Sequence, residues 1–453
     1  MRTFSLKVIA AGLALLTGAA HAHGADDDGL FKADGLTYEL VTVDGDSHFT
    51  LVGIDRGVKD VVIPEKLTNE DGTYPVTGIH LEEKCDIESI TIPSTIETIN
   101  ALISLTASMT TWPDHLKYVR IFDLKAWINV DFVCIADNSD GYVPRGLSNP
   151  LAKAAEMYIG DTPVTDLVIP EGTETISKEA FCGASFLKSV SFPSSLKEIG
   201  YAAFEGCTNV GYINVPDLKA WCGVDVKPFN RLMSIHHALD MDEYIPIFNN
   251  TAKLRIDGQE ISHLTIPEGV DSIGAGLFNN CGSIKTLYIP EHVTGLGASS
   301  FAYCGALENV YVFSAEPPTA CSVIGSEEVE DFGGTVVLYH YGNAFGEGRL
   351  LNRATLYVPV GSLEAYKGDK YWGCFRNIKE FDTTGIGNVA GESLSGCIRC
   401  EGGVISFEGL AEGIVPEVYS IDGVLRHRGA DSCALPSGIY IIRAGNESVK
   451  VRI

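Results

Sequence analysis

A pair of histidines stands beside other polar side chains that could contact a metal or another ligand. His236 and His237 are adjacent, and Asp240, Asp242 and Tyr244 follow them. Imidazole nitrogens and carboxylate oxygens are common metal ligands, so a histidine–aspartate metal site is one interpretation. Solvent-exposed histidines on a partly helical insertion are the preferred one. We therefore predict no metal and keep these residues as candidate contacts with a ligand.

Cysteines are a second group with possible chemistry, and the chain has 12 of them. Cys207, Cys281 and Cys304 each stand three residues after a phenylalanine, which predicts buried free thiols packed between neighbouring turns. Disulfides are the alternative, since adjacent turns would lie near disulfide distance. Cys397 and Cys400 form a C-x₂-C pair with no second pair nearby, so a zinc site is not predicted.

Catalytic motifs are missing from the sequence. It contains no G-x-S-x-G, H-E-x-x-H, P-loop or dinucleotide fingerprint. The acidic run at Glu327, Glu328, Glu330 and Asp331 lacks the ligand arrangement of an EF-hand. With its prolines and glycines, the segment 315–353 is predicted to be a protruding loop. We expect a non-enzymatic protein without a cofactor.

The elements that must position these residues are sequence repeats. Apolar residues fall at fixed offsets from Pro170, and Pro193 restarts the pattern 23 residues later. The same offsets follow Pro267 and Pro290. A period of this length is the signature of leucine-rich repeats, in which each repeat adds one short strand and one turn. The predicted fold class is an α+β repeat, a leucine-rich repeat solenoid with a small C-terminal β-sandwich.

Each repeat has the same internal plan. Two apolar residues alternate with one polar or small residue directly before the proline, which predicts a short strand with one buried face. The proline has no N–H and ends the strand. Eleven residues after the proline stands a phenylalanine: Phe181, Phe204, Phe278 and Phe301. A helical or 3₁₀ turn would point each ring inward, and stacked rings would form a continuous spine.

Several motifs together point to a known family. Ile-Pro recurs with apolar residues at fixed distances, Ala203 begins an AFEGC sequence, and Thr355 begins a stretch that looks like a terminal repeat. In these features residues 61–382 resemble the BspA-like leucine-rich repeat proteins of bacterial cell surfaces. The resemblance implies a surface scaffold that binds other proteins, often as an adhesin. It implies no particular ligand, because the family is defined by its scaffold.

The N-terminus indicates export. Residues 1–22 read as a secretory signal peptide, with Arg2 and Lys7 before a short apolar run and a cleavage site near Ala22. That run is too short to span a bilayer, so a membrane-spanning protein is not expected. Cleavage would remove both basic residues and change the formal net charge from −26 to −28. Such a charge disfavours nucleic acid as a partner.

The repeats are flanked by smaller modules. Residues 23–60 contain two alternating apolar runs around an Asp-Gly turn, which predicts an N-terminal β-hairpin that caps the repeat domain. Residues 383–396 are rich in small residues and predict a linker. Residues 397–453 predict the β-sandwich, which resembles the sorting domain of type IX secretion cargo. A degenerate surface-associated β module is the alternative.

The sequence Asp-Leu-Lys-Ala-Trp occurs twice, ending at Trp127 and Trp221. Its aspartate predicts a helix N-cap, and each tryptophan is interpreted as the packing anchor of a short helix, with a sugar-stacking surface as the alternative. After each copy follows a divergent insert, 134–156 and 227–253, which we expect to be a loop on one face of the solenoid.

Three functions agree with these features. The leading one is an exported or cell-surface protein that binds a host extracellular protein or another bacterial surface protein. A glycan-binding surface protein and a structural surface component are the alternatives. The binding site is expected either on the inserts or on the strand face of the solenoid. The individual candidates are Trp127, Trp221, His236, His237, Asp240, Asp242 and Tyr244.

Overall fold

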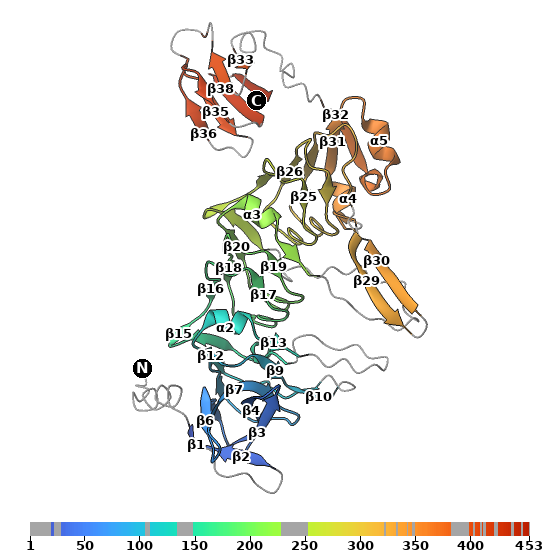
Figure 1. Ribbon diagram of the computed structural model, residues 1–453. Helices are drawn as coiled ribbons and strands as arrows, with labels where there is room; N and C mark the ends of the chain where they lie inside the picture. The colour runs from blue at the N-terminus through green and yellow to red at the C-terminus, as the bar shows by residue number, and fades with distance from the viewer. Residues whose placement is uncertain are drawn as a thin grey trace. The chain divides into compact units, whose positions relative to one another are not determined.

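A computed structural model describes residues 20–21, 29–104, 109–133, 148–227, 252–320, 323–331, 334–341, 343–346, 349–381, 398–401, 404–407, 410, 414–420, 425–435, 439–444 and 447–452 (Figure 1). The chain divides into two compact units, and each is described by itself. Unit 1 consists of Met1–Pro216 and Val224–Ala252, and unit 2 of Asp217–Gly223 and Lys253–Ile453. Short strands form most of the regular structure in the described residues.

The strand before each repeat proline belongs to a parallel ladder, here called the first ladder. In unit 1 it forms two sheets, β5–β8–β12–β14 and β16–β18–β20. Their strands are β5 (Asp60–Val62), β8 (Ser89–Thr91), β12 (Tyr118–Ile121), β14 (Glu156–Ile159), β16 (Asp166–Val168), β18 (Ser189–Ser191) and β20 (Tyr212–Val215). Leu167, Val190 and Ile213 align across three strands and are buried. The prediction of a short strand with one buried face is confirmed.

Each repeat also contains a second short strand, which the sequence analysis did not predict. These strands form a second parallel ladder in unit 1, in two groups: β7 (Thr73–His80), β9 (Thr98–Asn100) and β13 (Asp131–Phe132) in one, and β17 (Thr175–Ile176), β19 (Glu198–Ile199) and β21 (Asp225–Val226) in the other. Ile176 and Ile199, six residues after their prolines, are buried in it. The prediction of one strand per repeat was wrong, because a two-residue strand is too short to show alternation.

The phenylalanine rings stack as predicted. The ring centroids of Phe181 and Phe204 in unit 1 are 5.2 Å apart, with planes 12° from parallel. In unit 2 the corresponding values for Phe278 and Phe301 are 5.1 Å and 3°. The rings stand on turns and not on helices. A helix is not formed because the Phe181 N–H donates to the next repeat, to the carbonyl oxygen of residue 203 at 2.7 Å.

These turns share a left-handed residue nine positions after the proline. Its φ is 57°, 51°, 67° and 53° at Glu179, Ala202, Gly276 and Ser299. For a non-glycine residue this conformation costs roughly 1–2 kcal/mol. Hydrogen bonds between neighbouring turns offset that cost: the Glu179 N–H donates to the Tyr201 carbonyl at 2.8 Å, and the Ser299 N–H donates to the Asn343 carbonyl at 3.0 Å.

The three repeat cysteines are buried beneath the stacked rings. In unit 1 the Cys207 thiol donates to the Phe181 carbonyl oxygen at 3.2 Å, and in unit 2 Cys304 donates to Phe278 at 3.1 Å. Cys281 is also buried, and all three thiols are free. The prediction of buried free thiols is confirmed for this set.

The N-terminal segment is larger than the predicted hairpin. The strands β2 (Leu30–Ala33), β3 (Leu36–Val43) and β4 (Asp46–Ile54) form an antiparallel meander. The expected Asp-Gly turn joins β3 to β4, with Asp44 and Gly45 at φ 54° and 94°. β4 pairs in parallel with β7, so the meander covers the edge of the second ladder. Next to β7 lies β6 (Lys66–Thr68), which pairs with β1 (Ala20–His21).

The helices of the two Asp-Leu-Lys-Ala-Trp sequences are capped as predicted. α2 (Leu124–Ile128) begins after Asp123, whose carboxylate accepts hydrogen bonds from two backbone N–H groups. α3 (Leu218–Cys222) begins after Asp217, which accepts one. α2 belongs to unit 1 and α3 to unit 2. Unit 1 also contains the short elements β10 (Leu102–Ser104), β11 (Met109–Thr110), η1 (Pro150–Ala152) and β15 (Thr162–Pro163).

Unit 2 repeats the same plan. Its first ladder has the order β24–β26–β28–β31–β32, and its second ladder consists of β25 and β27. The elements of this part are β22 (Lys253–Ile256), β23 (Gln259–Glu260), β24 (His263–Thr265), β25 (Ser272–Ile273), β26 (Thr286–Ile289), β27 (Gly295–Leu296), β28 (Asn309–Val312), α4 (Arg349–Arg353), β31 (Thr355–Pro359), α5 (Leu363–Gly368), η2 (Trp372–Cys374) and β32 (Asn377–Phe381).

The predicted protruding loop at 315–353 contains regular structure. β29 (Val323–Asp331) and β30 (Gly334–Tyr341) form an antiparallel hairpin, and the acidic run lies on β29. The loop prediction gave weight to the acids and glycines of the segment. It overlooked the valine- and tyrosine-rich sequence of β30, which favours a strand.

The C-terminal residues form two antiparallel sheets, β33–β34–β37 and β36–β35–β38–β39. Their strands are β33 (Ile398–Glu401), β34 (Val404–Phe407), β35 (Glu417–Ser420), β36 (Leu425–Arg428), β37 (Cys433–Ala434), β38 (Ile439–Ala444) and β39 (Glu447–Arg452). Buried residues of both sheets, including Ile405 and Ile442, belong to one apolar cluster. The predicted linker 383–396 lies outside the described residues, as do residues 1–19 and 22 of the predicted signal peptide.

Candidate functional site

The two tryptophans that were candidate binding residues are buried. Trp127 is 2% exposed, donates its indole N–H to the Ala180 carbonyl oxygen at 2.9 Å, and packs edge-to-face on Phe132. Trp221 is 3% exposed. A sugar stacks on a free ring face, which neither residue offers. We therefore remove both from the candidate site, and their burial suits the packing role.

The other five candidates lie outside the described residues: His236, His237, Asp240, Asp242 and Tyr244. The same holds for residues 134–147 and 228–250, which make up most of the two inserts. A role for them stays a prediction. Within the described ranges, no three His, Cys, Asp or Glu side chains are grouped so that they could hold a metal ion.

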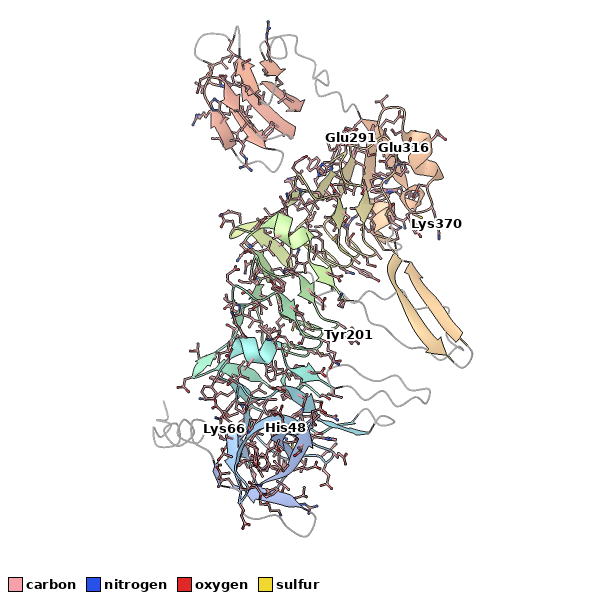
Figure 2. The ribbon with its side chains drawn as sticks, in the orientation of Figure 1. His48, Lys66, Tyr201, Glu291, Glu316 and Lys370 are labelled. Atoms are coloured by element: carbon pink, nitrogen blue, oxygen red, sulfur yellow. The ribbon has the colours of Figure 1, made fainter. Side chains whose placement is uncertain are left out.

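The first ladder of unit 2 carries two rows of side chains, one on either side of its buried positions. Figure 2 draws the described side chains as sticks. Leu264, Leu287, Val310 and Leu356 align across its strands and are buried, so the residues on either side of each face the opposite side of the strands, where Thr286 alone is also buried. The polar row consists of His263, Thr286, Asn309, Thr355 and Asn377. The tyrosine row consists of Thr265, Tyr288, Tyr311, Tyr357 and Lys379.

The three tyrosine rings form a regular stack. The centroids of Tyr288 and Tyr311 are 5.1 Å apart with planes 16° from parallel, and those of Tyr311 and Tyr357 are 4.4 Å apart at 9°. Each ring is partly exposed. Because the faces of the middle ring are covered by its neighbours, the stack presents ring edges and hydroxyl groups to a ligand.

Two tyrosines of the stack have a raised pKa. Burial, and to a lesser degree the neighbouring Tyr311, raise the pKa of Tyr288 to about 12. Burial and the Tyr357 hydroxyl raise the pKa of Tyr311 as well. At neutral pH these phenols are therefore uncharged and able to donate hydrogen bonds.

One side of the tyrosine row adjoins further aromatic side chains. Phe381 packs edge-to-face on Tyr311, with centroids 5.4 Å apart, and on Phe313 at 5.2 Å. Phe313 stands at the position that a proline occupies in the two preceding repeats. Val360, one residue after β31, is 68% exposed. Together these residues extend the apolar border of the row.

The two rows are almost free of charge. In the five paired strands they contain no aspartate or glutamate, and Lys379 carries their one permanent charge. The chain as a whole has 59 acidic and 33 basic residues, so a neutral strip departs from its surroundings. Tyrosine offers a large, rigid contact area at low entropic cost and is enriched at protein interfaces. The arrangement is suited to contact and contains no evident catalytic group.

The first ladder of unit 1 carries an aromatic cluster of another kind. The Arg120 guanidinium lies over the rings of Tyr118 and Tyr158, 5.6 and 5.4 Å from their centroids. It also forms an ion pair with Asp161. The Tyr158 hydroxyl donates to Glu156 at 2.8 Å. Since these charged groups are paired with one another, the cluster offers few groups to a ligand.

The sequence contained a signal for the tyrosine row that was overlooked. Each tyrosine is the middle residue of a strand, in Leu-Tyr-Ile, Val-Tyr-Val and Leu-Tyr-Val, where it was treated only as a polar or small position. Tyr288 and Tyr311 are 23 residues apart, but Tyr357 follows 46 residues later. Because the hairpin of β29 and β30 lies between Tyr311 and Tyr357, the sequence does not show directly that these two tyrosines stand on neighbouring strands.

Comparison with known families identifies the repeats. Residues 155–223 and 256–327 match the BspA type leucine rich repeat region, in six copies. The chain contains BspA-type leucine-rich repeats. Tyr288 and Tyr311 lie inside the second matched range, and Tyr357 lies beyond it.

Solved structures with similarity to this chain include two proteins described as leucine-rich. A leucine-rich cell surface protein from Faecalibacterium prausnitzii is 18% identical, with a TM-score of 0.35, over 78% of this chain and 95% of its own. A leucine-rich repeat protein from Bacteroides ovatus is 18% identical, with a TM-score of 0.30, over 63% and 71%. The pneumococcal vaccine antigen PcpA is 12% identical, with a TM-score of 0.26, over 80% and 100%.

No curated protein matches this chain. Among the residues described by the structure, no helix has both the length and the apolar character needed to cross a membrane.

Proposed function

We propose that this protein is an exported or cell-surface solenoid that binds other proteins and has no enzymatic activity. The observation that carries the proposal is the stack of Tyr288, Tyr311 and Tyr357 on a neutral strip of the first ladder. The BspA-type repeats support it, because repeat scaffolds offer long contact surfaces without a pocket. Adhesion is the biological role that the family resemblance implies.

A protein ligand fits the stack better than a glycan. Sugars bind to aromatic residues through an open ring face, and both faces of Tyr311 are covered by its neighbours. Ring edges with hydroxyl groups can instead contact apolar side chains and backbone carbonyl groups at the same time. The glycan-binding alternative would need another surface, such as the inserts.

The ends of the chain fit an extracellular location. The signal-peptide-like residues 1–22 would direct export, with cleavage near Ala22. We infer that the two C-terminal sheets form a β-sandwich and act as a sorting module of the type IX kind. This inference rests on their shared apolar cluster and on sequence features such as Tyr440.

Binding of the mature protein to a panel of extracellular matrix proteins, measured beside a glycan array, tests the proposal. We expect a protein on the panel to bind, and a Tyr288→Ser/Tyr311→Ser variant to bind at least about tenfold more weakly. Tyr303→Ser is the matched control, because Tyr303 is 67% exposed on a turn outside the strand face. Binding to glycans alone, or equal loss in both variants, would refute the proposal.

A further inference from the structure

The spacing of the tyrosine row matches the repeat of one kind of peptide. The ring steps of 5.1 and 4.4 Å place Tyr288 and Tyr357 about 9.5 Å apart along the row. A polyproline II helix rises about 3.1 Å per residue and completes a turn in three residues, or about 9.3 Å. Residues three positions apart on such a helix would therefore meet the outer two rings of the stack.

The hydrogen-bonding chemistry also agrees. A polyproline II helix makes no internal hydrogen bonds, so its carbonyl groups are free acceptors, and proline has no N–H to donate. The Tyr288 hydroxyl and the Asn309 and Asn377 amides of the adjacent row are donors, whereas the Tyr311 and Tyr357 hydroxyls are hydrogen-bonded to each other. With donors on the two rows and acceptors on the peptide, few polar groups of the contact would stay unpaired.

The charge of the strip favours an uncharged partner segment. The described strands place no acidic side chain in either row, although the chain has a formal net charge of −26. A basic peptide would be attracted to the acidic surfaces elsewhere on the chain and would gain little electrostatic energy from the two rows. A proline-rich segment carries no charge, and its preformed helix costs little entropy to bind on an aromatic surface.

We propose that the tyrosine row binds a proline-rich segment of a partner protein in the polyproline II conformation. The inference rests on the proposed function and specifies the chemistry of the partner. Tyr288, Tyr311 and Tyr357 supply the contact surface, and the polar row supplies additional hydrogen bonds along one side of the bound peptide.

Fluorescence anisotropy of a labelled oligoproline peptide, titrated with the full-length protein, tests this assignment. A glycine–serine peptide and an oligolysine peptide of equal length are the comparison probes. We expect oligoproline to bind with little dependence on salt, since the contact is uncharged, and the glycine–serine peptide not to bind. Oligolysine, if it binds, should be released by salt.

Three variants locate the contact. Tyr311→Ala should weaken oligoproline binding at least about tenfold. Tyr311→Phe, which keeps the stacked ring, should show a smaller loss. Tyr303→Ala should bind as the parent does. Circular dichroism of each variant verifies that the fold is retained.

Two results would overturn the assignment. Oligoproline binding that is absent, or that Tyr311→Ala leaves unchanged in a folded protein, removes the polyproline ligand. If a matrix protein is still captured in a manner that requires Tyr288 and Tyr311, the proposed function stands and the partner presents a different surface. If no matrix protein is captured while oligoproline binds through Tyr311, the peptide assignment stands without the adhesive role.

Discussion

At the scale of single residues, the interior of each unit depends on stacked aromatic rings. Phe278 is 3% exposed and packs against Phe301 with planes 3° apart. Removing such a ring leaves a cavity between two repeats, because backbone hydrogen bonds hold the neighbouring turns in place.

We predict that Phe278→Ala lowers the free energy of unfolding by about 3–5 kcal/mol. Phe122, which is 36% exposed, provides a matched control, and Phe122→Ala should cost less than half as much. Urea denaturation of both variants measures the difference. Equal stability of Phe278→Ala and the parent would show that the rings do not support the stack.

The buried thiols lead to a prediction about pH. Burial raises the pKa of Cys207 from 9.0 to about 12 and raises the pKa of Cys281 and Cys304 in the same direction. A thiol with a raised pKa in the folded state favours folding below the unfolded pKa, and that contribution is lost as the unfolded chain ionises. Stability should therefore fall as pH rises from about 9 towards 12.

Urea denaturation at a series of pH values measures this fall in stability, and thiol labelling tests the burial that causes it. At pH 8 the three cysteines should react with a thiol reagent only after denaturation, because they are buried and protonated. Cys374 is exposed and serves as the internal control that reacts in the native protein. Denatured, unreduced protein in which these three show no free thiol would mean that they form disulfides.

At the scale of elements, the sequence predicted those parts of a repeat that have their own pattern. The strand ending near Pro170 shows apolar alternation, and the Phe181 turn carries a constant ring. The second ladder was missed because β17 and β19 have two residues each. The hairpin of β29 and β30 was missed because acidic residues and glycines concealed its strand propensity.

The strand face was predicted only as one of two candidate binding surfaces. The tyrosines could be seen in the sequence, but their alignment depends on the register between β28 and β31, which the hairpin separates by 46 residues. The buried positions of Trp127 and Trp221 agreed with the packing interpretation. Burial in a solenoid follows the repeat, whereas a surface contact depends on neighbours from other repeats.

Replacing residues 228–250 by a glycine–serine linker separates the two candidate surfaces. We predict that the shortened protein folds, since β21 and β22 end or begin outside the replaced residues. If the tyrosine row is the site, capture of a matrix protein should be unchanged. A folded variant that loses capture would place recognition on the insert, with His236 and His237 as its first candidates.

At the scale of the whole molecule, the scaffold and the proposed contact use different positions of each repeat. The stacked rings and buried thiols lie in the interior of each repeat. The outward positions of the strands are therefore free to vary. In unit 1 these positions include Asp60, Glu156 and Asp166, whereas in unit 2 they form the neutral strip. We expect the acidic surface to keep the exported protein soluble and the strip to determine its partner.

Site-specific photo-crosslinking tests directly whether the tyrosine row contacts the captured protein. A photoreactive phenylalanine analogue is placed at position 311 in one sample and at position 303 in another, and each is irradiated with a matrix protein that the parent captures. Mass spectrometry then identifies the crosslinked site. The account predicts a crosslink from position 311 and none from position 303. A crosslink from position 303 alone would contradict it.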